Sequence, residues 1–219
     1  MLNDNYPKRH PENKELKLYY GSEYRGLPVM YEKGALIEPY LEKMYNTIKL
    51  AMNHYPKVFA FRVDIHFPNN WIHDDMNDKN VIERFISSFR AKIKSSRQTA
   101  KLNENYHDSV VRYVWCREIG KYGRPHYHFL ILLNGNAFSA MGAVNSPIPN
   151  TYSRLSEAWA SALGLDVVAV KGLVNKVRSF FTEAQGYDLG ELFYVSSYLC
   201  KAGTKYYGDG RRNFGVSRV

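Results

Sequence analysis

Two histidines stand two positions apart in the apolar segment PHYHFLILL, residues 125–133. Side chains at positions i and i+2 of a β-strand point to the same face, so His126 and His128 would present two imidazoles side by side. Such a pair can hold a metal ion. The alternative is two buried core histidines, since a chain of 219 residues with 7 histidines contains about 0.2 pairs of this spacing by chance. A third ligand on the same face would favour the metal site.

A carboxylate faces the pair if the strand-like segments 109–119 and 126–133 form a hairpin. The connection between them, GKYGRP, has the length and the turn residues of a hairpin loop. If the hairpin is centred near the tyrosine of this connection, Glu118 lies opposite His126 and on the same face. Glu118 is therefore the predicted third ligand.

Other polar side chains surround this predicted site. The same register places Cys116 opposite His128, where we expect a small buried thiol rather than a ligand. Asp64 and His66 share one face of a further alternating strand, residues 58–67, and are the alternative third ligand or hydrogen-bond partners of an imidazole. Two imidazoles and a carboxylate suit Mn²⁺ or Mg²⁺ with open positions for phosphate oxygens, and imidazole also accepts Zn²⁺.

A second pattern, YVSSYLCK, spans residues 194–201. On a helix, Tyr194, Tyr198 and Lys201 fall at positions i, i+4 and i+7, so two phenols and an ammonium group form one stripe. Chance is the alternative explanation, because 18 tyrosines give about 1.5 pairs of this spacing. A metal ion that withdraws charge from a phosphate and a tyrosine that attacks it are complementary parts of one reaction.

Three segments, taken in chain order, resemble the motifs of one enzyme family. FAFRVDIHFP, PHYHFLILL and YVSSYLCK resemble the three motifs of the HUH endonucleases, which include the initiators of rolling-circle replication. The form Y-x-x-x-Y-x-x-K looks like the two-tyrosine class of that family. The ending RRNFGVSR looks closest to the inovirus-type gene 2 replication proteins of phages and prophages. The likeness covers residues 58–219.

This resemblance implies a reaction and its partners. The reaction is sequence-specific nicking and joining of single-stranded DNA at a replication origin, through a covalent 5′-phosphotyrosine that initiates rolling-circle replication of a phage or prophage-like element. No helicase motor follows the nicking motifs, so a separate host helicase and polymerase are expected. By position, the resemblance implies Mn²⁺ or Mg²⁺ on the ligands His126, His128 and Glu118, the nucleophiles Tyr198 and Tyr194, and Lys201 at the phosphate.

Three other functions fit the same residues. A catalytically inactive origin-binding protein would bind DNA without using Tyr198. A transposase or relaxase would carry out the same chemistry on another element. A zinc hydrolase would use the same three ligands with water as its nucleophile, and it would form no covalent adduct with DNA.

The elements that position these residues follow from hydrophobic periodicity. Together they predict an α+β sandwich, in which helices pack on a central antiparallel sheet. The resemblance implies that this sandwich is the RRM-like or palm-like HUH fold. We expect residues 1–55 to form an N-terminal arm and helix, and residues 56–219 to form the nicking domain with a basic tail. The expected helices are 36–52, 79–102, 152–163 and 190–202, a further strand is 166–170, the arm is 1–33, and a loop begins at 203.

The charge of the chain favours an acidic partner. Thirty Lys and Arg against 21 Asp and Glu give a net charge of +9, which suits single-stranded DNA. No acid interrupts residues 84–101, although a solvated helix face would explain that as well. The predicted DNA contacts are Arg84, Arg90, Lys92, Lys94, Arg97, Lys101, Lys205, Arg211, Arg212 and Arg218.

The remaining sequence features concern the compartment. The 2 cysteines lack the spacing of a redox or zinc motif, which favours free thiols in a reducing compartment. The polar N-terminus does not resemble a signal peptide, and no apolar run reaches the length of a membrane span. We therefore expect a soluble cytoplasmic protein without membrane contact.

Overall fold

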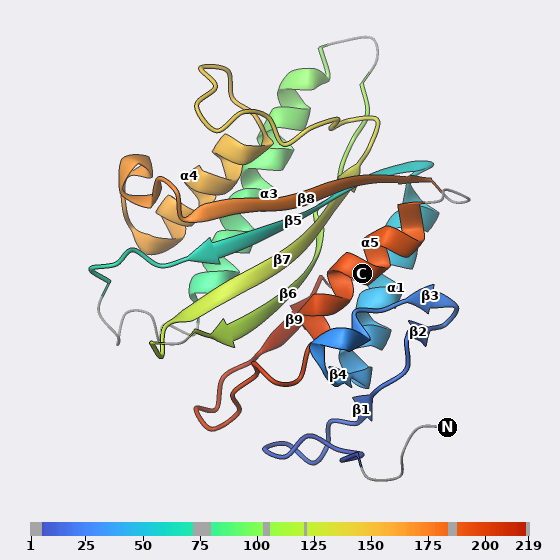
Figure 1. Ribbon diagram of the computed structural model, residues 1–219. Coiled ribbons are helices and arrows are strands. Elements are labelled where there is room, and N and C mark those ends of the chain that lie inside the picture. Colours follow the sequence, from blue (N-terminus) through green and yellow to red (C-terminus); the bar gives the residue numbers. More distant parts are fainter. Residues whose placement is uncertain (1–5, 72–79, 103–105, 121, 184–187, 218–219) are drawn as a thin grey trace.

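The computed structural model describes residues 6–71, 80–102, 106–120, 122–183 and 188–217. Within these ranges, four α-helices cover the two faces of one five-stranded antiparallel sheet (Figure 1). The predicted α+β class and its central antiparallel sheet are confirmed. No helix in the described ranges combines the length and the apolar character needed to cross a membrane.

The central sheet has the strand order β8-β5-β7-β6-β9, and all neighbouring strands run antiparallel. Its inner strands are rich in valine, isoleucine, leucine and phenylalanine, residues that favour a pleated, buried backbone. Because β7 lies in the middle, a side chain on it has a strand neighbour on each side. The strands are β5 (Lys57–His66), β6 (Arg112–Ile119), β7 (Pro125–Asn134), β8 (Val174–Glu183) and β9 (Phe214–Val216).

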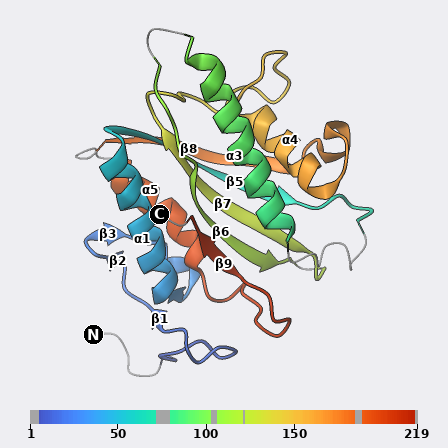
Figure 2. The same ribbon diagram turned by 180° about the vertical axis from the view of Figure 1, so that it is seen from behind.

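Each face of the sheet has its own pair of helices (Figures 1 and 2). Helices α3 (Val81–Ala100) and α4 (Thr151–Leu163) cover one face, which we call the α3/α4 face. Helices α1 (Glu38–His54) and α5 (Asp188–Ser197) cover the other, the α1/α5 face. Successive side chains of a strand point to opposite faces, so the odd-numbered residues of β7 belong to the first core and the even-numbered ones to the second.

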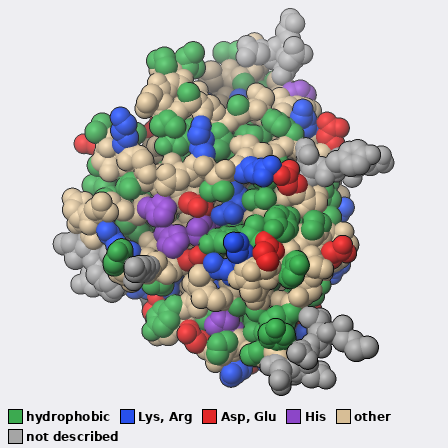
Figure 3. Space-filling view, in the orientation of Figure 1, with side chains coloured by type: hydrophobic (Ala, Val, Ile, Leu, Met, Phe, Trp, Pro, Cys, Tyr) green, Lys and Arg blue, Asp and Glu red, His purple; other side chains and the backbone are tan. Residues whose placement is uncertain are grey.

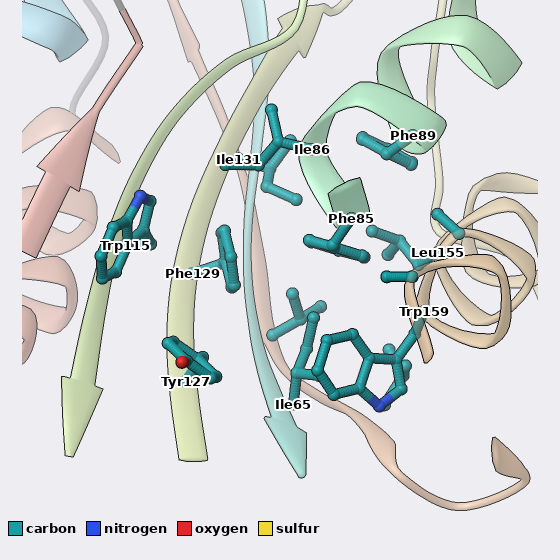
Figure 4. Packing of buried hydrophobic residues seen from close by; sticks show 14 of the residues in the cluster. Ile65, Phe85, Ile86, Phe89, Trp115, Tyr127, Phe129, Ile131, Leu155 and Trp159 are labelled. Carbon is teal, nitrogen blue, oxygen red and sulfur yellow. The ribbon is translucent and has the colours of Figure 1, made fainter. Parts of the chain in front are cut away.

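Aromatic packing fixes the helices on the α3/α4 face (Figure 4). The ring of Phe85 on α3 lies 5.1 Å from that of Phe129 on β7 and 5.9 Å from that of Trp159 on α4, both edge to face. Trp159 Nε1 also donates a hydrogen bond to the backbone carbonyl of His66 at 2.8 Å. These contacts hold the end of β5 that carries Asp64 and His66.

The N-terminal segment forms short strands before α1. Helix α1 shares its buried core with β5, β6, β7 and α5, so the boundary expected between residues 1–55 and 56–219 crosses one continuous hydrophobic core. Strand β3 contacts α5. The short elements are β1 (Leu18–Tyr19), β2 (Glu23–Tyr24), β3 (Leu27–Pro28), the 3-10 turn η1 (Tyr31–Lys33) and β4 (Leu36–Ile37).

The prediction of a strand at residues 166–170 was wrong. A 3-10 helix, η2 (Val167–Val170), occupies this position, and Val167 and Val168 are exposed, so the β-branched run does not mark a buried strand. Strand β8 follows it and was missed. It is an edge strand with mostly exposed side chains, and its sequence therefore lacks the alternation that marks a half-buried strand.

The predicted helix 190–202 ends early. Helix α5 ends at Ser197, and the 3-10 turn η3 (Tyr198–Cys200) follows. The Ser197 hydroxyl donates to the carbonyl of Tyr194 at 2.7 Å and accepts from the amide of Met30 at 2.8 Å. Side-chain bonds of this kind compete with the regular backbone bonds of a helix. The tighter turn breaks the predicted i, i+4, i+7 stripe.

Candidate metal centre

The hairpin brings the three predicted ligands together. Strands β6 and β7 pair with Glu118 opposite His126 and Cys116 opposite His128, which confirms the predicted register. One ligand atom from each of Glu118, His126 and His128 lies within 4.8 Å of the other two. In the orientation of Figure 1, histidine side chains gather at the surface next to acidic and basic ones (Figure 3). The donor set is two nitrogens and one carboxylate.

Strand β5 orients one of the imidazoles. It pairs with β7 so that Asp64 lies opposite His128, and Asp64 Oδ1 accepts a hydrogen bond from His128 Nδ1 at 2.6 Å. Because the carboxylate can only accept, the proton belongs on Nδ1, and Nε2 faces Glu118 Oε2 at 3.4 Å. Nε2 is buried and has no hydrogen-bond partner among the described residues. In many metal sites an imidazole binds the metal through one ring nitrogen and donates a hydrogen bond to a carboxylate through the other. These residues therefore fit a divalent cation.

A buried lysine keeps the third predicted ligand, Glu118, ionised. Lys205 Nζ donates to Glu118 Oε1 at 2.9 Å, and the two side chains are 0% and 3% exposed. Burial alone would raise the pKa of Glu118, but the nearby imidazole of His128 and the charge of Lys205 outweigh it and lower that pKa. Lys205 was predicted to contact DNA, and its burial contradicts that role. Its ammonium group instead balances the carboxylate.

Burial keeps the second imidazole neutral. Together with the nearby His128, it lowers the pKa of His126 to about 4, so the ring can coordinate a cation at neutral pH. The ring of His66 stacks on His126 at 5.3 Å, and burial lowers its pKa as well. Burial raises the pKa of Cys116 to about 11, so the thiol stays protonated. Of the two residues considered as alternatives to the carboxylate ligand, Asp64 is the hydrogen-bond partner of His128.

One tyrosine lies beside this cluster. The ring of Tyr198 lies 5.3 Å from the ring of His128, edge to face. Lys201 Nζ donates a hydrogen bond to the Tyr198 hydroxyl at 3.2 Å. The turn η3 and the residue after it thus place a phenol oxygen and an ammonium group together on the α1/α5 face.

A second cation at this tyrosine was missed by the sequence analysis. The guanidinium of Arg62 lies 5.1 Å from the centre of the Tyr198 ring and bonds to Asp64 at 3.3 Å. Arg62, Asp64 and His66 alternate along β5 and point to one face. That spacing was the available signal, because three polar residues on the inner face of a buried strand require partners.

The second predicted nucleophile lies elsewhere. The hydroxyl of Tyr194 donates a hydrogen bond to the carboxylate of Glu32 in η1. This hydrogen bond raises the pKa of Tyr194. The structure therefore brings Tyr198 and Lys201 to the cluster, and it does not bring Tyr194 there.

The cations predicted to contact DNA have different surroundings. Arg84 Nε donates to the carbonyl of Ala162 at 2.9 Å, and Lys92 forms an ion pair with Glu157 at 2.7 Å, so both join α3 to α4. Lys94 is exposed. Arg97 lies over the ring of Phe138, and Lys101 lies near that of Tyr106. A groove on the α3/α4 face is lined by Arg90, Arg211 and Arg212. Arg218 lies outside the described residues.

Comparison with known proteins places the chain in a family. Residues 21–217 match the YagK/YfjJ C-terminal domain. YfjJ of Escherichia coli (strain K12), described as uncharacterized, is 28% identical over 206 residues, which cover 85% of this chain and 97% of YfjJ. YagK of the same organism, also described as uncharacterized, is 28% identical over 200 residues, covering 85% of this chain and 95% of YagK. No solved structure matches the chain. The family match spans α1, the whole sheet and the polar cluster, and the chain therefore belongs to the YagK/YfjJ C-terminal domain family.

Proposed function

We propose that this protein nicks and rejoins single-stranded DNA through a covalent tyrosine–phosphate bond. The observation that carries the proposal is the position of Tyr198, whose ring lies 5.3 Å from that of His128 and whose hydroxyl accepts a hydrogen bond from Lys201. The donor set of Glu118, His126 and His128 suits a divalent cation such as Mn²⁺ or Mg²⁺. The resemblance of the three motifs to HUH endonucleases supports the same chemistry and an HUH-type sheet.

The side chains have distinct tasks in this reaction. A bound divalent cation would withdraw charge from the phosphate oxygens. Tyr198 Oη attacks the phosphorus and its proton passes to water, while the bond from phosphorus to the 3′ oxygen breaks and that oxygen takes a proton from water. Lys201 orients the phenol, and Lys201 with Arg62 offsets the negative charge of the phosphate. The 5′ phosphate stays on the tyrosine, so the 3′ hydroxyl can reverse the step and rejoin the strand.

The proposal uses one tyrosine in the first cleavage. Tyr194 has no role in that step, because its hydroxyl is bonded to Glu32. The free 3′ hydroxyl would prime rolling-circle replication of a phage or prophage-like element, with unwinding and synthesis supplied by a separate helicase and polymerase. This biological setting rests on the resemblance of the motifs.

A covalent adduct tests the proposal directly. The full chain is incubated with Mn²⁺ and a pool of single-stranded oligonucleotides of random sequence that carry a 3′ fluorophore, and the products are separated under denaturing conditions. We expect a labelled protein band that disappears with EDTA and with Tyr198→Phe and persists with Tyr206→Phe, an exposed tyrosine of the C-terminal segment.

Three results would contradict the proposal. They are the absence of an adduct with both Mn²⁺ and Mg²⁺, an adduct that survives EDTA, and cleavage of the DNA without any adduct. The last result would instead identify a hydrolase with water as its nucleophile.

A further inference from the structure

A groove of about 900 Å³ lies on the α3/α4 face of the sheet, and the proposed reaction does not use it. The first half of α3, strands β6 and β7, and the C-terminal segment 210–216 line it. Trp115 and Arg117 face the groove, whereas Cys116 and Glu118 alternate with them along β6 and lie opposite His128 and His126 on the other face. The groove and the cluster therefore lie on opposite faces of the same strand.

The floor of the groove is aromatic. Tyr113 and Trp115 contribute from β6, and Tyr127 contributes from β7. The rings of Trp115 and Tyr127 are 6.0 Å apart, and Figure 4 shows these two side chains on neighbouring strands, on the face turned toward α3. Trp115 and Tyr127 are 8% and 5% exposed and belong to the core, whereas Tyr113 is only partly buried, so Tyr113 is the ring of this floor that can contact a nucleic-acid base.

Two guanidinium groups lie over this floor. Arg90 on α3 lies 5.2 Å from the ring centre of Tyr113, and Arg212 lies 5.9 Å from that of Trp115. Both arginines are exposed, and neither forms a hydrogen bond or an ion pair with any other residue that the structure describes. A guanidinium group that stacks on a ring keeps the N–H donors in its plane available for a phosphate.

A buried arginine holds one side of the groove in place. Arg117 is 2% exposed, donates from Nε to Asn213 at 3.2 Å, and forms an ion pair with Asp209. These bonds fix the segment that carries Arg212 against the end of β6. The position of Arg212 over the floor is therefore set before any ligand arrives, which lowers the entropy that binding costs.

The positive charge of the groove lining favours an anionic ligand. Among the described lining residues, Glu83 is the one acid, against the four arginines Arg90, Arg117, Arg211 and Arg212. The volume lies within the roughly 300–1,000 Å³ of small-ligand pockets, which accommodates one or two nucleotides. Cations that track a phosphate backbone beside stacking rings are typical of sites for single-stranded nucleic acid.

We propose that this groove binds a short stretch of single-stranded DNA, with its phosphates on Arg90 and Arg212 and a base against Tyr113. The choice of DNA rests on the proposed function. The segment 205–213 connects the two sites, since Lys205 bonds Glu118 on one face and Asp209 bonds Arg117 on the other. Single-stranded DNA bound at Glu118, His126 and His128 would continue past the end of β6 into the groove.

Binding without cleavage tests this proposal. The full chain is titrated, in EDTA, into a fluorescein-labelled oligothymidine of about 15 nucleotides, and the anisotropy is recorded over a range of salt concentrations. We expect Arg90→Ala and Arg212→Ala each to weaken binding about tenfold and to lower the salt slope by about 0.7. Arg178→Ala is the matched control, because it removes an exposed guanidinium on β8, the opposite edge strand, and it should change the affinity less than twofold.

Four outcomes would overturn the proposal. They are equal losses for all three variants, no binding by the unchanged protein in EDTA, equal competition by duplex DNA of the same length, and tighter binding of the matching RNA. The adduct assay separates this inference from the proposed function. If the adduct on Tyr198 forms but the arginine variants bind normally, the groove proposal alone fails; if the arginine variants lose binding but no adduct forms, the nicking proposal alone fails.

Discussion

The two tyrosines of the segment YVSSY stand four positions apart and have opposite electrostatic surroundings. Tyr198 lies beside the imidazole of His128 and accepts a hydrogen bond from the ammonium of Lys201. Tyr194 donates to the carboxylate of Glu32, which would repel a phosphate. The segments packed against each phenol produce this difference, because Glu32 of η1 contacts Tyr194, whereas strands β7 and β5 bring His128 and Arg62 to Tyr198. Spacing in the sequence therefore does not distinguish the two tyrosines, whereas their contacts with distant segments do.

The largest predicted effect separates the two tyrosines. Tyr198→Phe should lower the single-turnover rate of adduct formation by more than about 10³-fold, since the attacking oxygen is removed. Tyr194→Phe should keep the rate within about twofold. Both rates are measured under saturating Mn²⁺ with the same oligonucleotide. An equal loss in Tyr194→Phe would show that the contact with Glu32 does not exclude that tyrosine from the reaction.

The next effect concerns the carboxylate behind His128. Asp64→Asn keeps the shape of the side chain but weakens the hydrogen bond that orients the imidazole, so Mn²⁺ affinity should fall about 10–100-fold. Titration calorimetry measures this affinity. Glu191→Gln removes the charge of a half-exposed acid on α5 and serves as the control. If the two variants bind Mn²⁺ equally well, Asp64 does not support a metal ligand.

The metal-free protein should lose stability as the pH falls. His126 has a pKa of about 4 when folded, whereas an unfolded histidine titrates near 6.5. The unfolded chain therefore binds the proton first, and stability declines between about pH 6.5 and pH 4. At pH 5 the free energy of unfolding is lower than at pH 7, and His126→Gln should remove about 1 kcal/mol of that decrease once solvent screening is allowed for.

Urea unfolding at pH 7 and pH 5 checks this dependence, with the exposed His54→Gln as the control. An unchanged pH dependence in His126→Gln would contradict the desolvated environment assigned to this imidazole.

The smallest effect lies on the side of Tyr194. Glu32→Gln should lower the pKa of Tyr194 toward its ordinary value, because the hydrogen bond to a charged acceptor is lost. The resonance of Tyr198 should stay in place. An NMR titration of tyrosine labelled with ¹³C at Cζ resolves both residues. A change confined to the Tyr198 resonance would contradict the contact of Glu32 with Tyr194.

The part of the site that depends on local periodicity was predictable. The register of Glu118 with His126 follows from a short turn between two alternating strands, and a slip by one residue would have turned buried side chains to the wrong face. The central sheet and its helices follow from the same kind of pattern.

Contacts between distant segments were not predictable in this way. Lys205 reads as one more cation in a basic tail, and only the packed structure shows it buried against Glu118, 87 positions away. The contact of Tyr194 with Glu32 spans 162 positions. Burial of a charge depends on the three-dimensional position of its partner, and the spacing of charges along the chain does not report that position.

The position of the covalent bond tests the central claim most directly. The adduct formed with Mn²⁺ and single-stranded DNA is digested with a protease and a nuclease, and the peptide that retains a nucleotide is sequenced by mass spectrometry. The arrangement of Tyr198, Lys201 and the histidine cluster predicts the modification on Tyr198. A nucleotide on Tyr194, or on any residue outside η3, would contradict it.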